Sequence, residues 1–405
     1  MANSITAMSP TYWSKIMGIK LYKANVYRNI CSFREEAVLS NGQIVDRPYR
    51  ADIYVGTYTK GTALTAQDIT ATSDQLTVNK SFGALIYVDN IDKIQNKWSA
   101  ADAWATEMVE RLSNQIDAEG LYLATSATDT VDYNDLDSNQ TAGVPIILTT
   151  SNVLNMFTVA ARKLSVNNVG SNRFFVISAQ VKQVLLTYLA GRESILGDRT
   201  GEAGNIGRYM GFDLFESNNL TAKVRITPAA VPTEGLTLII NGVTITFEGT
   251  PATVTSGFAV DVESTVAAQI TSLTTMINTP TTDAATTGKP ATGSYLAAIQ
   301  RGWVAVDGTT YIDIWIKGAS TIATLTGTYT DATGANVTHY KQINFCGEKK
   351  AMDMVIQKQP SVEMASTVSA GKSGQNVLGL ILLGTSVFND MKARIFGVEV
   401  DSSVF

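Results

Sequence analysis

The clearest pattern of apolar and polar positions runs from Phe82 to Ala124. It starts with an apolar segment, Phe82–Val88, and continues into a stretch where apolar residues recur every three or four positions: Ala101, Trp104, Ala105, Met108, Leu112 and Ile116. This spacing predicts an amphipathic helix, which we expect to begin after the N-cap Ser99 and to end near Gly120. At about 1.5 Å per residue, such a helix is roughly 30 Å long.

Before this helix, the pattern predicts a long two-stranded excursion. Residues 50–59 alternate in character as a strand does, and Lys60-Gly61 is a turn signal. The polar, threonine-rich residues 62–79 then lead back to the apolar strand. Because a two-stranded ribbon is only marginally stable alone in water, we expect this one to lie on a neighbouring molecule. The residues expected to contact that neighbour are Arg50, Tyr54, Tyr58 and Lys60.

After the helix, residues 145–220 alternate between element types. Helices are predicted at Ser151–Leu164 and Gln180–Leu189, with the strand Arg173–Ser178 between them. Near the C-terminus, three further strand patterns are present, at Ala351–Gln357, Gln375–Leu383 and Ile395–Val400. An alternation of this kind predicts a mixed α and β architecture.

Between these regions the composition changes. Residues 221–338 are rich in threonine and poor in lysine and arginine. Hairpins are predicted around Asn241-Gly242, a favoured pair for type I′ turns, and over Asp307-Gly308. A helical stripe lies between the two hairpins, at Val262, Val266, Ile270, Leu273 and Ile277. We interpret this segment as an α+β unit inserted into a longer fold.

The order of elements resembles the major capsid proteins of tailed double-stranded-DNA bacteriophages, which have the Hong Kong 97-type fold. The resemblance rests on FGALIYVDNIDKIQ leading into the long helix, and on GNIGRYMGFDLFESNN at residues 204–219, after the helix–strand–helix series. It covers about residues 50–220 and 340–400 and leaves the inserted unit unexplained. The implied fold is α+β. The last apolar run, 377–388, is interrupted by Gly379 and Gly384 and is too short to span a membrane.

The resemblance implies a division of the chain into six segments. These are an N-terminal arm at 1–48, an extended loop and strand at 49–90, the spine helix of a peripheral domain at 91–130, an axial domain at 131–221, an inserted α+β domain at 222–340, and a return to the peripheral and axial domains at 341–405.

In this family, subunits form pentamers and hexamers that close into an icosahedral shell around double-stranded DNA. The resemblance thus implies a structural virion protein that is not an enzyme, has no cofactor and is assembled in the cytoplasm of a bacterial host. The implied partners are copies of itself, portal, scaffold and decoration proteins, and DNA bound without sequence preference on the inner face. Some members cross-link a loop lysine to a neighbour's asparagine, and Lys60 occupies a similar position.

Composition agrees with a surface that partners cover. Charged residues make up 17% and hydrophobic residues 45% of the chain, whereas about 25% charged is typical. Depletion of charge is characteristic of interface cores. The net charge of −5 argues against binding of nucleic acid by bulk charge. However, five lysine and arginine residues and no acidic residue precede Glu35. This charge pattern suits a solvated arm, or an arm that faces packaged DNA or an acidic scaffold.

Enzymatic and metal chemistry has little support. The one histidine, His339, is expected in a polar loop, and Cys31 and Cys346 lie too far apart in sequence for a metal motif. Gly371-Lys372-Ser373 lacks the first glycine of a phosphate loop. An aspartate-rich loop, Ala124–Ala142, has no calcium-loop spacing, so no metal site is predicted.

Two alternative functions remain open from the sequence. An encapsulin-like compartment would share the fold and enclose protein cargo. A soluble carboxylate-dependent hydrolase would draw its acids from the aspartate-rich loop, whose members are Asp129, Asp132, Asp135 and Asp137, whereas Asp89 and Asp92 are expected to form the strand-to-helix turn.

Overall fold

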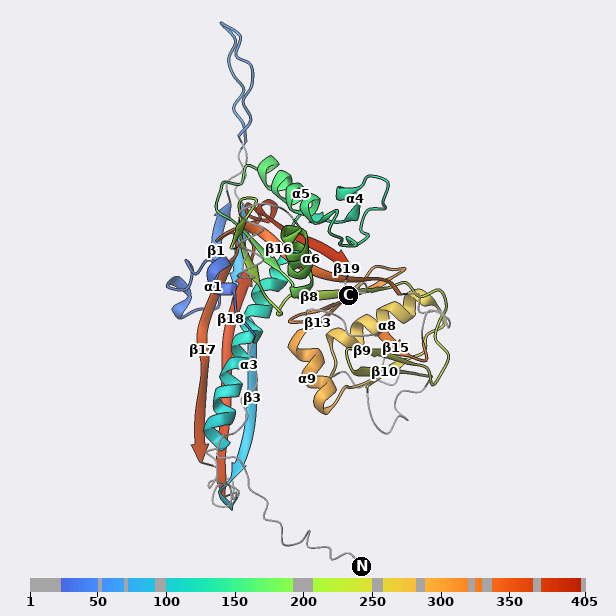
Figure 1. The fold of residues 1–405 in the computed structure, drawn as a ribbon. Coiled ribbons are helices and arrows are strands. Elements are labelled where there is room, and N and C mark those ends of the chain that lie inside the picture. The colour runs from blue at the N-terminus through green and yellow to red at the C-terminus, as the bar shows by residue number, and fades with distance from the viewer. Residues whose placement is uncertain are drawn as a thin grey trace, which may run out of the picture.

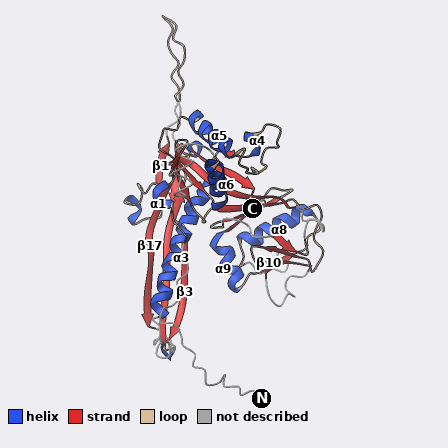
Figure 2. Ribbon diagram, viewed as in Figure 1, coloured by secondary structure: helices blue, strands red, loops and turns tan. Residues whose placement is uncertain are grey.

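The structure is a computed structural model that describes residues 23–49, 53–68, 72–91, 100–191, 207–249, 258–281, 288–319, 325–329, 337–366 and 373–401. Figure 1 shows a long blade, a mixed sheet with helices at one end of the blade, and a compact module beside them. In Figure 2, long strands dominate the blade, and helices lie against the sheets. The chain is therefore α+β, as the sequence predicts.

The blade is a three-stranded antiparallel sheet with one long helix along it. Its strand order is β17 (Asp353–Ser366), β18 (Gly374–Ser386) and β3 (Lys80–Asp89). The helix, α3 (Ala100–Tyr122), confirms the predicted amphipathic helix, and its apolar stripe is buried from Met108 to Ile116. A Cβ at Gly379 would lie 2.5 Å from the Sδ of Met108, so a glycine here lets the helix approach the sheet.

The two edges of the blade differ. Among the described strands, β3 pairs only with β18, along its whole length. The opposite edge, β17, contains Pro360 and shifts its register twice, between Ile356 and Lys358 and between Lys358 and Ser361. Proline cannot donate a hydrogen bond to a ladder, and bulges twist an edge away from further pairing.

The mixed sheet holds nine strands. Seven follow the order β13-β14-β8-β16-β5-β7-β6, and β19 and β4 attach through β16. Their bounds are β4 (Thr130–Val131), β5 (Arg173–Ile177), β6 (Arg208–Tyr209), β7 (Phe212–Glu216), β8 (Thr221–Ile226), β13 (Trp303–Asp307), β14 (Ile312–Ile316), β16 (Val337–Glu348) and β19 (Ile395–Asp401).

Three helices belong to this mixed sheet: α4 (Tyr133–Leu136), α5 (Val153–Val166) and α6 (Ala179–Ala190). The last two confirm the predicted helices, and β5 confirms the strand between them. Their core is aromatic, since the ring of Phe157 lies 4.8 Å from that of Phe175, which in turn lies 5.5 Å from Phe212.

The module has its own five-stranded sheet, ordered β12-β11-β10-β9-β15. Its elements are β9 (Thr237–Ile240), β10 (Val243–Glu248), β11 (Phe258–Asp261), α8 (Val266–Asn278), β12 (Gly288–Lys289), α9 (Gly293–Gly302) and β15 (Leu325–Gly327). The predicted hairpin is confirmed, because Val243 pairs with Ile240 and the turn residues Asn241 and Gly242 both have positive φ, 47° and 79°.

The second predicted hairpin, β13–β14, is also present, but it pairs with β8 and so extends the mixed sheet. Its apolar side chains nevertheless pack with those of the module in one core, which runs from Ala222 to Tyr329. His339 was expected in a loop; that prediction is wrong, since its backbone pairs with Arg225 within β16. The threonine-rich segment thus has one core but contributes strands to two sheets.

The predicted strand at 50–59 is not formed in residues 53–59, which the structure shows as extended but unpaired chain. The pairing lies at the base instead, where β1 (Ile44–Tyr49) runs antiparallel to β2 (Thr72–Thr77). Short elements complete the fold: α1 (Tyr27–Ile30), η2 (Val38–Ser40), η3 (Leu123–Ser126) and η7 (Lys392–Arg394). Residues 53–68, here called the strap, project from the end of the molecule opposite the blade tip (Figure 1).

Candidate assembly surfaces

The strap exposes apolar side chains to an unusual degree. Val55 is 97% exposed, Tyr54 77%, Tyr58 65% and Leu64 66%. Lys60 is exposed too, and Arg50 lies outside the described residues. Since burying such side chains stabilises each by about 1.5–3 kcal/mol, a strap left in water forgoes a large favourable free energy.

Contacts within the strap are few. The Tyr54 amide donates to Oε1 of Gln67 at 3.1 Å, and Nε2 of Gln67 donates back to the Tyr54 carbonyl at 2.5 Å. At the tip, the Thr62 amide donates to the Thr59 carbonyl at 3.0 Å, and Gly61 has φ +87°, which confirms the predicted turn. These contacts hold the two halves of the strap near each other, but neither half pairs with a described strand.

At the base of the blade, a buried carboxylate of α3 organises the chain around it. Oδ1 of Asp117 accepts hydrogen bonds from the amides of Val26 and Tyr27, both at 2.8 Å. Its Oδ2 accepts from Nδ2 of Asn219 at 2.8 Å and from the hydroxyl of Ser217 at 3.3 Å. Burial raises the pKa of Asp117, although these hydrogen bonds oppose the shift. Asp117 thereby ties the incoming N-terminal segment to the spine helix and the mixed sheet.

A second buried acid, Glu119, joins three parts of the molecule. Its side chain is fully buried and pairs with Lys80 of β3 and with Lys317, which follows β14, each at 2.7 Å. Burial alone would raise the pKa of Glu119, but the two ammonium groups outweigh it and hold the pKa below its ordinary value. Blade, spine helix and mixed sheet therefore meet at one charge cluster.

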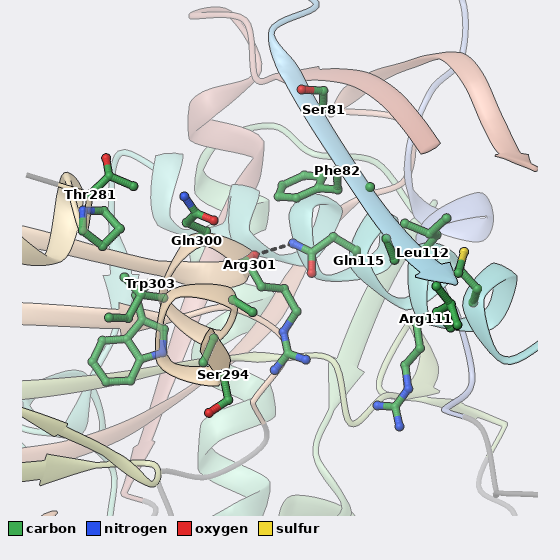
Figure 3. Close-up of a pocket in the computed structure, with 18 of the residues that line it drawn as sticks. Ser81, Phe82, Arg111, Leu112, Gln115, Thr281, Ser294, Gln300, Arg301 and Trp303 are labelled. Carbon is green, nitrogen blue, oxygen red and sulfur yellow. Dashed lines mark hydrogen bonds between the residues drawn. The ribbon is translucent and has the colours of Figure 1, made fainter. Parts of the chain in front are cut away.

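A groove of about 1150 Å³ lies between the blade and the module (Figure 3). One wall is β3 from Ser81 to Ile86 together with α3, and the other is α9 and its neighbours. Nε2 of Gln115 donates to the Arg301 carbonyl at 2.6 Å, which joins the two walls. In Figure 3, Arg301 and Trp303 lie on the module side of the groove, and Phe82 and Arg111 lie on the blade side.

The aspartate-rich loop has a structural role in this fold. Asp132 caps α4, since its Oδ1 accepts from the Asp135 amide while Asp135 accepts from the Asp132 amide, both at 3.2 Å. Nζ of Lys163 lies 2.8 Å from both Asp129 and Asp135. Among the described residues, no group of three or more histidine, cysteine, aspartate or glutamate side chains is placed to hold a metal ion. The loop carboxylates are thus used in capping and ion pairing.

The other candidate groups lie apart from one another. Cys31 and Cys346 are both buried, and burial raises the pKa of each thiol above its ordinary value. Ser373 is followed by strand β18 rather than by the helix that a phosphate loop needs, and positions 371 and 372 lie outside the described residues. Asp89 accepts from the Ile91 amide at 2.8 Å, in keeping with a turn, and Asp92 lies outside the described part.

Sequence reasoning missed the two buried acids and the groove. Glu and Asp are rarely buried, so nothing in the helical pattern distinguishes Asp117 and Glu119 from solvated positions. Their one signal is position, because they lie between Ile116 of the apolar stripe and Gly120. A Cβ at Gly120 would lie 3.0 Å from the side chain of Met354 and 3.4 Å from that of Tyr27. None of the helices that the structure describes has the length and apolar character needed to cross a bilayer.

Comparison with known proteins gives likeness in structure and none in sequence. No family model matches the chain, and no curated protein does. A solved structure from Mycobacterium phage Che8 superposes with a TM-score of 0.59 at 14% identity, covering 97% of this chain and 98% of that one. The capsid structure of Cyanophage P-SCSP1u superposes with a TM-score of 0.53 at 11% identity, covering 98% and 94%.

This chain has a phage capsid fold. The match extends over nearly the full length of both chains. Within that capsid fold, the strap exposes large apolar side chains, and the groove is lined by aromatic and arginine side chains from two parts of the subunit.

Proposed function

We propose that this protein is the major capsid protein of a tailed phage, whose copies form the pentamers and hexamers of an icosahedral head around double-stranded DNA. The observation that carries the proposal is a capsid fold over the whole chain combined with an apolar strap exposed on the isolated subunit. Such a strap is stable only where another molecule covers it. The role is structural and involves no catalysis.

The proposed architecture is the Hong Kong 97 type. The N-terminal arm leads to Asp117, the extended loop is the strap with its β1–β2 base, and the blade with α3 is the peripheral domain. The mixed sheet with α5 and α6 is the axial domain, and the module is the inserted domain. The continuous apolar core of residues 222–329 supports treating that insertion as one unit.

Tyr54, Tyr58 and Lys60 are the proposed contacts to a neighbouring copy, together with Arg50, which lies outside the described residues. Their rings and stems supply apolar area, and Lys60 at the tip can reach a carboxylate or an asparagine of the next subunit. The strap of each subunit contacts one neighbour, and the same subunit is contacted by the strap of another. Closed symmetry repeats this contact around the shell.

Charge supports an outward position for the module. The inserted segment, residues 222–340, contains eight acidic residues and five lysine and arginine residues, so it has a net charge of −3. The remainder of the chain has a net charge of −2. An acidic surface facing packaged DNA would be repelled by the phosphates, so the module is better placed on the outer surface. Scaffold, portal and decoration proteins are further proposed partners.

The test is electron microscopy of the protein expressed with and without its phage genes. Closed shells with icosahedral symmetry, and DNA inside those from infected cells, are the expected result. Shells that enclose an enzyme and no DNA would instead favour a cargo compartment. A small soluble oligomer at all concentrations would refute the proposal.

A further inference from the structure

One end of the mixed sheet gathers basic side chains. Strands β5, β7 and β19 begin at this end and β16 ends there, since Arg173 pairs with Glu348. Six cations lie at or next to these strand ends, and together they are called the basic rim: Arg173, Arg208, Lys349, Lys350, Lys392 and Arg394. Within the described chain, the carboxylates that form ion pairs with them are Asp213 and Glu348. The rim therefore has an excess of positive charge.

The contacts of the rim leave part of this charge uncompensated. Asp213 pairs with both Lys349 and Arg208, and Arg394 lies 2.9 Å from Glu348. Lys350 is exposed and Lys392 half-buried, and neither side chain forms an ion pair with a residue that the structure describes. These two ammonium groups are available to an anionic partner.

One corner of the module has the opposite charge. Glu248 at the end of β10 lies beside Asp261 at the end of β11, and a Cβ on Gly249 would lie 3.6 Å from the carboxylate of Glu234. These residues and Glu263 are called the acidic corner. None of the four forms an ion pair within the described ranges. Burial and the nearby Glu263 carboxylate raise the pKa of Asp261, as expected where like charges meet without a cation.

The rim and the corner lie on different parts of the subunit. The core of the module packs with β8, β13 and β14, at one edge of the mixed sheet. The rim is formed at the ends of β5, β6, β7, β16 and β19, which occupy the rest of that sheet. Each surface thus carries the charge that the other lacks, and no ion pair between described residues joins them in one copy.

We propose that the basic rim of one copy contacts the acidic corner of the module of the next copy. The inference rests on the proposed function and makes the module a lateral contact between neighbouring subunits. Because the two surfaces differ, the contact is head-to-tail, and repeated head-to-tail contacts close into rings where the rotation fits. Opposite charges also disfavour wrong pairings, since rim against rim or corner against corner is repulsive.

A second copy fits these surfaces better than nucleic acid does. The phosphates of a DNA duplex would attract the rim, but they would repel the corner and leave its four carboxylates without a cation. A neighbouring subunit compensates both surfaces at once. Such contacts between exposed charges are screened by salt, so they orient the subunits more than they bind them.

Charge reversal tests the proposal. Lys350→Glu with Lys392→Glu reverses the free cations of the rim, and Glu234→Lys with Glu248→Lys reverses half of the corner. Each pair of substitutions should lower the yield of closed shells at least about tenfold, because like charges then face each other. All four substitutions together keep the net charge of the wild type and should restore the yield to within about threefold.

The matched control exchanges a pair that is already satisfied inside one subunit. Nζ of Lys182 lies 2.6 Å from Glu216, so Lys182→Glu with Glu216→Lys should assemble like the wild type. Normal shells from either reversed surface, or no recovery when both are reversed, would overturn the contact. Closed shells of the rim variant that lack DNA would also overturn it and assign the rim to nucleic acid. Failure of the wild type to form shells would instead refute the proposed function.

Carbodiimide cross-linking of the unmodified protein gives a second measurement that needs no variant. The reagent joins a lysine amine to a carboxylate as an amide and takes up the water that is lost. Mass spectrometry should find peptides with Lys350 or Lys392 linked to peptides with Glu234 or Glu248 in shells, and not in dissociated subunits. Rim lysines linked only to Asp213 and Glu348 in shells would contradict the proposal.

Discussion

The β9–β10 hairpin and the strap have the same kind of sequence pattern and opposite fates. Both alternate in character and both contain a turn signal, at Asn241-Gly242 and at Lys60-Gly61. The hairpin buries Ile240, Val243 and Ile245 in a core of its own chain, whereas the strap leaves its apolar residues in water. Alternation therefore predicts the capacity to be a strand, and the molecule that supplies the partner decides whether the strand forms.

This comparison separates two kinds of free energy. Side chains of the body stabilise the subunit, and those of the strap are expected to stabilise contacts between subunits. Substitutions in the two regions should therefore affect different measurements, and the following predictions run from the largest effect to the smallest.

Replacing residues 53–68 with a short glycine–serine linker should abolish closed shells. The subunit itself should lose less than about 0.5 kcal/mol of unfolding free energy, because every residue of the strap is exposed in the structure. Negative-stain microscopy measures the first effect and urea denaturation the second. Normal shells from this deletion would show that the strap is dispensable and would remove the distinction drawn above.

Asp117→Asn should affect the subunit itself and not the contacts between subunits. It should lower the free energy of unfolding of the subunit by about 2–3 kcal/mol. An amide cannot accept all the hydrogen bonds that reach the carboxylate, so donors such as Ser217 and Asn219 are left unsatisfied. Urea denaturation of the subunit measures the loss. Asp129→Asn, at a largely exposed carboxylate, is the matched control and should cost far less.

The pH dependence of this effect has a defined sign. The folded pKa of Asp117 is raised above its ordinary value, so its ionisation opposes folding. The favourable contribution is complete below the ordinary pKa of 3.8 and is lost as pH rises through the higher folded pKa. The wild type minus Asp117→Asn difference in unfolding free energy should therefore fall across that window, and a flat difference would show that Asp117 does not titrate there.

Lys317→Met should destabilise the subunit by about 1–3 kcal/mol, since it leaves the buried Glu119 with one cation in place of two. The folded pKa of Glu119 is held low, so its contribution is present above pH 4.5 and is lost as pH falls through the folded pKa. Urea titrations at pH 7 and pH 4 test this, and the difference between the variant and wild type should shrink in acid. Lys358→Met, in an exposed pair, is the control.

Gly379→Ala should have the smallest effect, about 1–2 kcal/mol, because the added methyl group would displace the flexible side chain of Met108. Thermal unfolding of Gly379→Ala with and without Met108→Ala should show coupling between the two positions. Purely additive effects would mean that α3 moves away from the blade as a whole.

Local patterns predicted much of the fold. The period of the helix α3, the strand β5 between two helices and the turn pair of β9–β10 are each encoded within a few residues, and all three are confirmed. The partner of β3 could not be predicted in this way. Leu85 pairs with Leu378, nearly three hundred positions later, and no local pattern specifies such a pairing.

The candidate surfaces were only partly predictable. The exposed tyrosines of the strap follow from an excursion with no core of its own, and their contacts with a neighbour stay a prediction. The groove could not be foreseen, because its walls are Ser81–Ile86 and the region around Trp303, which meet only once the module has folded beside the blade.

The unequal edges of the blade have a consequence for solubility. A long flat strand such as β3 is a hazard in a protein made in many copies, since two open edges would let sheets stack end to end into fibres. Pro360 and the two register shifts of β17 close one side, and the exposed Lys358–Glu363 pair adds charge there. Because only one edge of the blade can pair with another strand, identical blades cannot add edge to edge without limit. Concentrated subunits can therefore stay in solution until they assemble into the shell.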